Sequence, residues 1–307
     1  MRKVFNILRN IFAILGVLLV TIIVLNKTNV LDVRISPSYN AGLEGFLRSL
    51  RKSRPYVHDA ETFHIQAVPD SAKAAEIREY FQLDTLFGPD ASTWEKTLAI
   101  AQFVARNIPH ANQQSQPKSR NAIDLWEFTR TVEPGFNCRL HSILTYELLT
   151  SVGVEATYIT CLPKYDDGDC HVVNQVWIPE LEKWVMIDSD SGGYCATDGN
   201  GNLLSLQEIR ERYISGETIV YHPGFSAAQE SVGSEHYRYM AKDTYWFSSW
   251  EDIHYGQESG NRQGSRYLLL IPPGYKPFSK DEEDILTSDA EQFWAAPDRK
   301  SATKKRE

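Results

Sequence analysis

One stretch of the chain combines a helical pattern with a two-strand pattern. Leucine and isoleucine recur at helical spacing between Asn137, a residue that favours helix N-caps, and Gly153, which favours the position just after a helix. The runs HVVNQVWI and KWVMID follow, separated by residues 179–182, and indicate a hairpin of antiparallel strands. The sequence therefore predicts an α+β fold in which a helix packs on an antiparallel sheet.

Three residues with catalytic chemistry stand where these elements begin and end. Cys138 lies in the first turn of the helix, His171 opens the first strand, and Asp188 ends the second. The unpaired N–H groups and the dipole at a helix N-terminus favour a thiolate, which is the attacking form of cysteine. Directly opposed Cβ atoms on paired strands lie about 5 Å apart. Asp188 is therefore expected to bind one imidazole nitrogen and leave the other facing the sulfur.

Neighbouring residues compete for these roles. Asp190 faces the same side as Asp188 if the strand continues, but Asp188 ends a Trp-Val-x-x-Asp segment and is preferred. His141 lies one turn after the cysteine and can contact it, yet no carboxylate partner for it is evident, which favours a packing role. The cysteine's own N–H is the expected first oxyanion donor, with Asn137 and Trp126 as candidates for the second.

This arrangement resembles the transglutaminase-like superfamily, a papain-like group of cysteine enzymes with the order Cys, His, Asp. The resemblance covers roughly residues 90–220. Matching positions are Gly135, Cys138, Gly153, Val154, Ala156, His171, Asn174, Trp184, Val185 and Asp188. Gly135 stands three residues before the cysteine where the family usually has two, and Val173 and Gln175 replace the commoner Trp and Glu. The resemblance implies a papain/transglutaminase-like core with a Cys138, His171, Asp188 triad.

The expected activity is acyl transfer or hydrolysis at an amide or peptide bond, with a protein or peptide as substrate and no metal or organic cofactor. A catalytically silent binding module with the same fold is the alternative. Val173, Gln175 and the aromatic C-terminal region motivate it, whereas the intact triad positions argue against it. A redox role would require a C-x-x-C-like pair, which the sequence lacks.

The N-terminus carries a membrane-targeting pattern. Arg2, Lys3 and Arg9 precede the uncharged run IFAILGVLLVTIIVL, which with the apolar residues before it approaches the ~20 residues needed to span a bilayer. Neither an Ala-x-Ala-like cleavage site nor a lipid-anchor cysteine follows, so an uncleaved anchor is favoured over a cleaved signal or a buried core helix. The positive-inside rule places the N-terminus in the cytoplasm and everything after Lys27 outside it, in the periplasm or at the cell surface.

The remaining cysteines suit an oxidising compartment. With Cys138 assigned to the triad, at most one disulfide forms among Cys161, Cys170 and Cys195. A Cys161–Cys170 bond, a bond from either to Cys195, and three buried thiols all stay open. A zinc site from Cys161, Cys170, His171 and Cys195 is disfavoured because the C-x-x-C spacing of structural zinc sites is missing.

Composition is that of a globular chain. With 42% hydrophobic and 23% charged residues, disorder of the whole chain is excluded, and the net charge of −8 argues against general nucleic-acid binding. The oligomeric state stays open. The expected regions are a membrane anchor or signal segment at 1–28, a stem at 29–88, a catalytic domain at 89–220 and an aromatic-rich extension at 221–307.

Several further helices are expected from local patterns, at about residues 41–50, 72–81, 92–108, 121–129 and 206–213. The helix at 92–108 begins with a capping box of Ser92 and Glu95. In the C-terminal extension, Tyr245, Trp246 and Trp250 are expected to pack in the core rather than line a substrate cleft.

Overall fold

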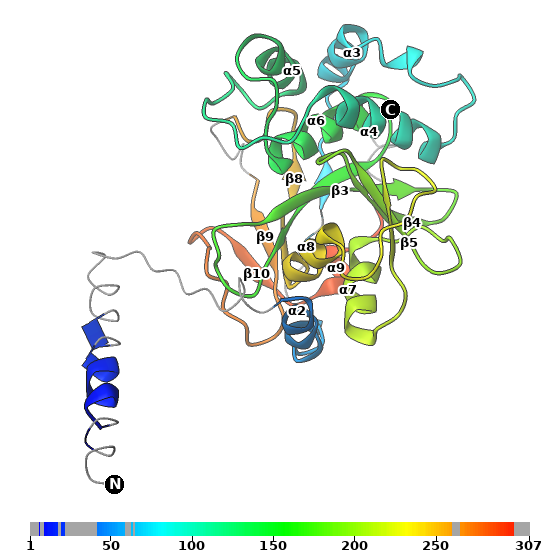
Figure 1. Cartoon of the computed structure of the whole chain (residues 1–307). Coiled ribbons are helices and arrows are strands. Elements are labelled where there is room, and N and C mark those ends of the chain that lie inside the picture. The colour runs from blue at the N-terminus through cyan, green and yellow to red at the C-terminus, as the bar shows by residue number, and fades with distance from the viewer. Residues whose placement is uncertain are drawn as a thin grey trace.

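The computed structural model describes residues 6, 9–17, 20–21, 42–58, 63, 65–259 and 265–297. Much of the expected membrane anchor lies outside this set. Within it, no helix is long and apolar enough to cross a membrane. The predicted α+β class is confirmed, because helices pack on both faces of one central sheet (Figure 1).

The central sheet has eight strands in the order β10-β9-β7-β2-β3-β4-β5-β6. Every neighbouring pair is antiparallel except β9 and β10. The strands are β2 (Ala156–Leu162), β3 (His171–Ile178), β4 (Lys183–Asp188), β5 (Tyr194–Thr197), β6 (Val220–Pro223), β7 (Trp246–Trp250), β9 (Tyr267–Leu270) and β10 (Ile285–Thr287). A separate parallel pair joins β1 (Gln66–Ala67) to β8 (Asp252–Ile253). The predicted hairpin is β3 and β4.

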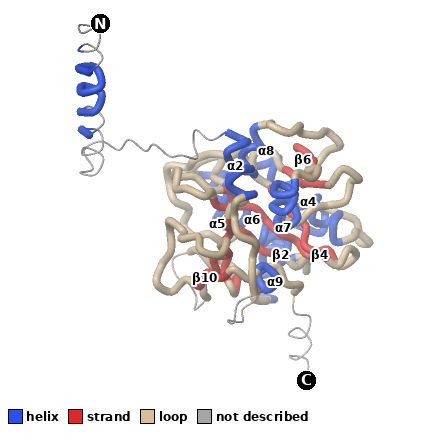
Figure 2. The backbone as a smooth tube through the Cα atoms, turned by 90° about the horizontal axis from the view of Figure 1, so that it is seen from below, coloured by secondary structure: helices blue, strands red, loops and turns tan. Residues whose placement is uncertain are grey.

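Two groups of helices cover the sheet. One face carries α3 (Ser71–Tyr80), α4 (Thr93–Asn107), α5 (Ala122–Thr131) and α6 (Cys138–Ser151). The other carries α2 (Gly42–Arg51), α7 (Leu206–Ser215) and α8 (Glu235–Asp243), which lie below the sheet in Figure 1, and Figure 2 shows α2 beside α8. The short elements are η1 (Leu83–Thr85) and α9 (Ala290–Phe293).

Polar caps set where the helices begin. Ser92 and Glu95 form the predicted capping box of α4, and Ser205 and Glu208 form another at α7. The Asp70 carboxylate accepts hydrogen bonds from two backbone N–H groups at the start of α3. Each cap satisfies N–H groups that have no partner within the helix, so it fixes the first residue of the element.

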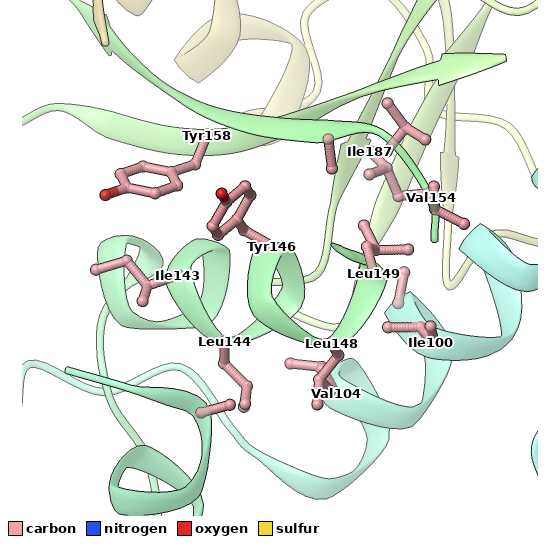
Figure 3. Close-up of a cluster of buried hydrophobic side chains, with 14 of the residues drawn as sticks. Ile100, Val104, Ile143, Leu144, Tyr146, Leu148, Leu149, Val154, Tyr158 and Ile187 are labelled. Atoms are coloured by element: carbon pink, nitrogen blue, oxygen red, sulfur yellow. The ribbon is translucent and has the colours of Figure 1, made fainter. Parts of the chain in front are cut away.

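Helix α6 is buried on nearly every side. Leu148 lies beside Val104 of α4, while Tyr146 lies against Tyr158 of β2 (Figure 3). A helix buried on most of its surface is a core helix even though α6 carries polar residues, and burying each leucine stabilises the fold by roughly 1.5–3 kcal/mol. Cys138 starts this helix and is therefore held by the hydrophobic core around α6, which is the first of two cores.

The second core lies on the other face and draws on the C-terminal region. Strand β7 pairs with β2, with Phe247 opposite Cys161. Trp246 is buried and its indole N–H donates to the Pro163 carbonyl at 2.9 Å, while Trp250 packs on Tyr267. Residues beyond 220 thus extend the same sheet that carries the predicted site.

Candidate active site

Cys138 is the first residue of α6, as the sequence predicts. The Asn137 side chain caps the helix by accepting from the Leu140 N–H at 3.3 Å, and Gly153 follows the helix with φ of +78°. The thiol is half-buried, with Sγ 3.8 Å from the Cys170 carbonyl oxygen. It therefore sits at the positive end of the helix dipole and remains within reach of solvent.

His171 and Asp188 meet across the hairpin. Nε2 of His171 lies 2.7 Å from Oδ2 of Asp188, and both side chains are buried. Asn174 opposes Ile187, so Asp188 stands opposite Val173 by the same register. The pair is therefore diagonal rather than directly opposed, and the imidazole bridges the extra distance. This bond leaves Nδ1 of His171 for other partners.

Cys138 and His171 share a compact cluster with Asp190. The Cys138 sulfur, a His171 ring nitrogen and an Asp190 carboxylate oxygen all lie within 4.8 Å of one another. Burial lowers the pKa of His171, but the charge and hydrogen bond of Asp188, with a smaller contribution from Cys138, raise this pKa well above its ordinary value. The imidazolium form is therefore favoured beside the sulfur.

Asp190 has two further histidine partners, which corrects the expectation that His141 lacks a carboxylate. The Asp190 carboxylate lies 2.8 Å from Nδ1 of His110 and 3.3 Å from Nδ1 of His141, and it accepts from the Ser191 N–H at 2.7 Å. Nε2 of His141 lies 3.1 Å from the Ile108 carbonyl oxygen. Both ring nitrogens of His141 therefore face hydrogen-bond acceptors, and His141 joins Asp190 to the end of α4.

Helix α8 covers His171 from the C-terminal region. The Tyr239 ring lies 5.1 Å from the His171 ring, and the His236 ring lies 6.4 Å from it in an edge-on arrangement. Burial, with the charge of His171, lowers the pKa of His236 to about 3, so His236 is neutral. His236 and Tyr239 stand three residues apart in the sequence HYRYM, so they lie on one face of a helix. This spacing is the sequence signal that could have identified them.

Helix α8 also holds the loop that leads into β3. The Tyr239 hydroxyl donates to the Cys170 carbonyl at 3.0 Å, and Lys242 Nζ lies 2.9 Å from Asp169 and 3.2 Å from Asp167. These contacts fix the backbone on either side of Cys170. They therefore set where His171 begins its strand.

The two departures from the resembled motif have structural roles. Gln175 Oε1 accepts from the Leu206 N–H at 2.9 Å and so helps to start α7, while Val173 is buried in the second core. Of the candidate oxyanion donors, Trp126 stacks on Phe103 with ring centroids 5.1 Å apart, and Asn137 serves as the cap of α6. Neither side chain is aimed at the sulfur by these contacts.

All four cysteines are free thiols. Burial raises the pKa of Cys170 and of Cys195 to about 11 and that of Cys161 well above its ordinary value. In the described part of the chain, Cys138, His171 and Asp190 form the one cluster suited to a metal, so the zinc site drawn from Cys161, Cys170, His171 and Cys195 is not assembled. Cys138 is the thiol that the fold sets beside a base.

Comparison with known families agrees with this geometry. Residues 82–189 match the model of the transglutaminase-like superfamily, which confirms the resemblance predicted from the sequence. No curated protein sequence matches the chain.

Three solved structures show partial similarity to this chain. A candidate cysteine protease from Cytophaga hutchinsonii is 21% identical with a TM-score of 0.31, over 40% of this chain and 39% of that one. A TGase is 16% identical with a TM-score of 0.26, over 39% and 31%, and a candidate protease from Parabacteroides distasonis is 12% identical with a TM-score of 0.26, over 47% and 26%. The chain spans less than half the length of each.

Proposed function

We propose that this chain is a cysteine enzyme that cleaves or transfers acyl groups at amide or peptide bonds through Cys138, His171 and Asp188. The observation that carries the proposal is the buried 2.7 Å bond between His171 and Asp188, with the Cys138 sulfur beside the same imidazole. A carboxylate, an imidazole and a thiol in this order orient and charge one another as a catalytic triad requires.

In the first half of the reaction, the Cys138 thiolate attacks the carbonyl carbon and forms a carbon–sulfur bond. The backbone N–H of Cys138 is available to the oxyanion because the first N–H groups of a helix lack intrahelical partners. The His171 imidazolium then gives its proton to the leaving amine as the carbon–nitrogen bond breaks. The product is a thioester on Cys138 and a neutral imidazole.

In the second half, neutral His171 removes a proton from the incoming nucleophile. Water gives hydrolysis, as in a peptidase or amidase, and an amine gives a new amide, as in cross-linking. Asp188 holds the imidazole in one tautomer through both halves and stabilises its charged form. This chemistry is complete without a metal or organic cofactor.

The proposed location is extracytoplasmic, with a single N-terminal span. The proposal rests on the uncharged run that ends at Leu25 and on the positive residues Arg2, Lys3 and Arg9 before it. Retention of the full chain in the membrane pellet after alkaline carbonate extraction supports an anchor, and release into the supernatant rejects it. Labelling of Cys138 by an impermeant maleimide in spheroplasts supports the outward orientation.

Alkylation of Cys138 tests the enzyme proposal. The full chain and its His171→Ala variant are treated with iodoacetamide at neutral pH, and labelling of the Cys138 peptide is followed by mass spectrometry. We expect fast labelling that slows roughly tenfold or more in the variant, because loss of the imidazolium lowers the thiolate fraction.

His222→Ala is the matched control, since His222 lies on β6 and bonds Thr197 rather than the triad. Its labelling rate should equal that of the unmodified chain. Equal and slow labelling in all three proteins would reject an activated thiol. It would favour the silent binding module instead.

A further inference from the structure

A thiol, an imidazole and a carboxylate converge at one point in this site, and Asp190 has no part in the reaction described above. Their donor atoms lie within 4.8 Å of one another. We propose that Cys138, His171 and Asp190 form a three-ligand site for Zn²⁺, and that the ion inhibits the enzyme by occupying its nucleophile and base. The inference deepens the proposed function, because inhibition presupposes that activity.

The donor set suits zinc. Zn²⁺ binds thiolate, imidazole and carboxylate at about 2.0–2.3 Å, and tetrahedral ligands at such distances lie roughly 3.5 Å apart. Binding therefore requires the three donors to close from within 4.8 Å to roughly 3.5 Å by side-chain rotation. Three protein ligands leave a fourth position for water. Hard cations such as Mg²⁺ prefer all-oxygen sites, so the thiolate selects against them.

Each ligand has an atom that can bind the ion, and binding releases the protons of the Cys138 thiol and of Nδ1 of His171. Nε2 of His171 is occupied by Asp188, which leaves Nδ1 for the ion. Among the described residues, Oδ2 of Asp190 accepts only from His110, whereas Oδ1 accepts from Ser191 and lies near His141. A carboxylate oxygen has two lone pairs, so Oδ2 can still coordinate a metal. The Cys138 sulfur lies 3.8 Å from the Cys170 carbonyl oxygen and within 4.8 Å of a His171 ring nitrogen and an Asp190 oxygen.

Residues next to the proposed ligands orient two of them through hydrogen bonds. Asp188 bonds the far nitrogen of His171, which is the carboxylate–histidine–metal arrangement of many zinc sites. His110 bonds the carboxylate of Asp190 at 2.8 Å in the same supporting role. Such partners commonly contribute a factor of roughly 10–100 to metal affinity.

The test measures metal binding directly with Co²⁺ and Zn²⁺ on the purified full chain. Co²⁺ should produce a thiolate charge-transfer band in the near ultraviolet that Zn²⁺ abolishes by displacement. We expect Cys138→Ser to lose the band and Asp190→Asn to weaken Zn²⁺ binding by roughly a hundredfold, since it removes an anionic ligand. Asp198→Asn makes the same exchange in a turn outside the cluster and should leave the affinity unchanged.

His110→Ala provides a second variant that the fold should tolerate, because the His110 side chain is 42% exposed. We expect roughly tenfold weaker Zn²⁺ binding in it. The proposal is overturned if no thiolate band forms, or if both Asp190→Asn and His110→Ala bind Zn²⁺ like the unmodified chain. Should Asp190→Asn fail to fold, His110→Ala decides.

The two proposals fail separately. Zn²⁺ binding at Cys138 without any acyl-transfer activity would keep the metal site and reject the proposed function. Acyl-transfer activity that Zn²⁺ leaves unchanged would keep the proposed function and reject the inhibitory metal site. Acyl-transfer activity that rises with bound Zn²⁺ would reject inhibition. If no activity were measured without the ion, the metal-free reaction would be rejected as well.

Discussion

At the scale of single residues, the environment separates four chemically identical thiols. Cys161 is fully buried in a strand, and burial raises the pKa of Cys170 and Cys195 to about 11, so these thiols stay protonated at neutral pH. Cys138 instead starts a helix beside an imidazole whose pKa is raised. Reactivity therefore follows from position in the fold, and the other thiols act as small apolar side chains.

Asp188 is expected to raise the catalytic rate by orienting His171 and stabilising its charge. Asp188→Asn keeps the size of the side chain but presents an amide in place of the carboxylate, so the imidazole loses its charge partner and can take the wrong tautomer. Turnover should fall by roughly 10²–10⁴. Turnover of a peptide amide at fixed pH measures the loss, and Asp252→Asn, which exchanges an aspartate at β8, should leave it unchanged. A fall smaller than about threefold would contradict the assigned role.

His141 is expected to act on stability. His141→Leu removes a buried imidazole and leaves Asp190 and the Ile108 carbonyl without this partner. Each buried polar group left without a partner costs roughly 1–3 kcal/mol of unfolding free energy, so the two together should cost at least about 2 kcal/mol. Urea unfolding measures it, and His222→Leu, which breaks one half-buried hydrogen bond, should cost only about 1 kcal/mol. Equal losses in the two variants would argue against these contacts of His141.

At the scale of elements, the segment before Cys138 is set by a close backbone approach. A Cβ on Gly135 would overlap the Pro109 carbonyl oxygen, and the Ala111 N–H donates to the Phe136 carbonyl at 3.0 Å. Gly135→Ala should therefore separate the two segments, cost roughly 1–3 kcal/mol in urea unfolding and slow Cys138 alkylation. Gly88→Ala has open space around the new methyl and should stay within about 0.5 kcal/mol. A Gly135→Ala variant with unchanged stability and unchanged Cys138 alkylation would mean that the backbone at Gly135 does not approach the Pro109 carbonyl this closely.

Glu147 joins α6 to two other elements and should make stability depend on pH. Its carboxylate accepts from the Ala122 and Gly256 N–H groups at 2.6 Å each, and burial raises the pKa of Glu147 to about 7. The folded state then holds a proton that the unfolded chain has lost above about pH 4.3. Stability from this group is present below that pH and is lost as pH rises to about 7, by roughly 3 kcal/mol.

Urea unfolding at several pH values between 4.5 and 8 checks this, with the range chosen around the value of about 7 for Glu147. In Glu147→Gln, the fall in unfolding free energy across this pH range should shrink by the same amount, even if the variant differs in stability at every pH. An unchanged slope in the variant would assign the pH dependence to another group.

The elements near the site were predictable where local signals specify them. Asn137, Gly153 and the β-branched and aromatic residues of the hairpin act within a few positions of themselves, so α6, β3 and β4 follow from the sequence. The partnership of His141 with Asp190 was missed because it joins a helix to the turn after β4. The diagonal pairing of His171 with Asp188 depends on a register that a turn pattern alone leaves unspecified.

At the scale of the molecule, the candidate site lies where the two cores meet. Cys138 packs against the core around α6, whereas Cys170 and Tyr194 pack against the core on the other face. The C-terminal region supplies β7, β9 and β10 to the same sheet and α8 to the surroundings of His171. These pairings join residues far apart in the chain, so no local sequence pattern after residue 220 specifies them.

A chain that ends at residue 220 is therefore expected not to fold. It would expose the edge of β2 that pairs with β7 and the apolar side chains that Trp246 and Phe247 cover. Thermal unfolding followed by circular dichroism should show no cooperative transition. The matched control is a full chain with a protease site inserted after Ala227, in an exposed loop, and then cut. There the C-terminal fragment stays docked, so the transition should persist. Cooperative unfolding of the shortened chain would instead make residues 221–307 a separable addition.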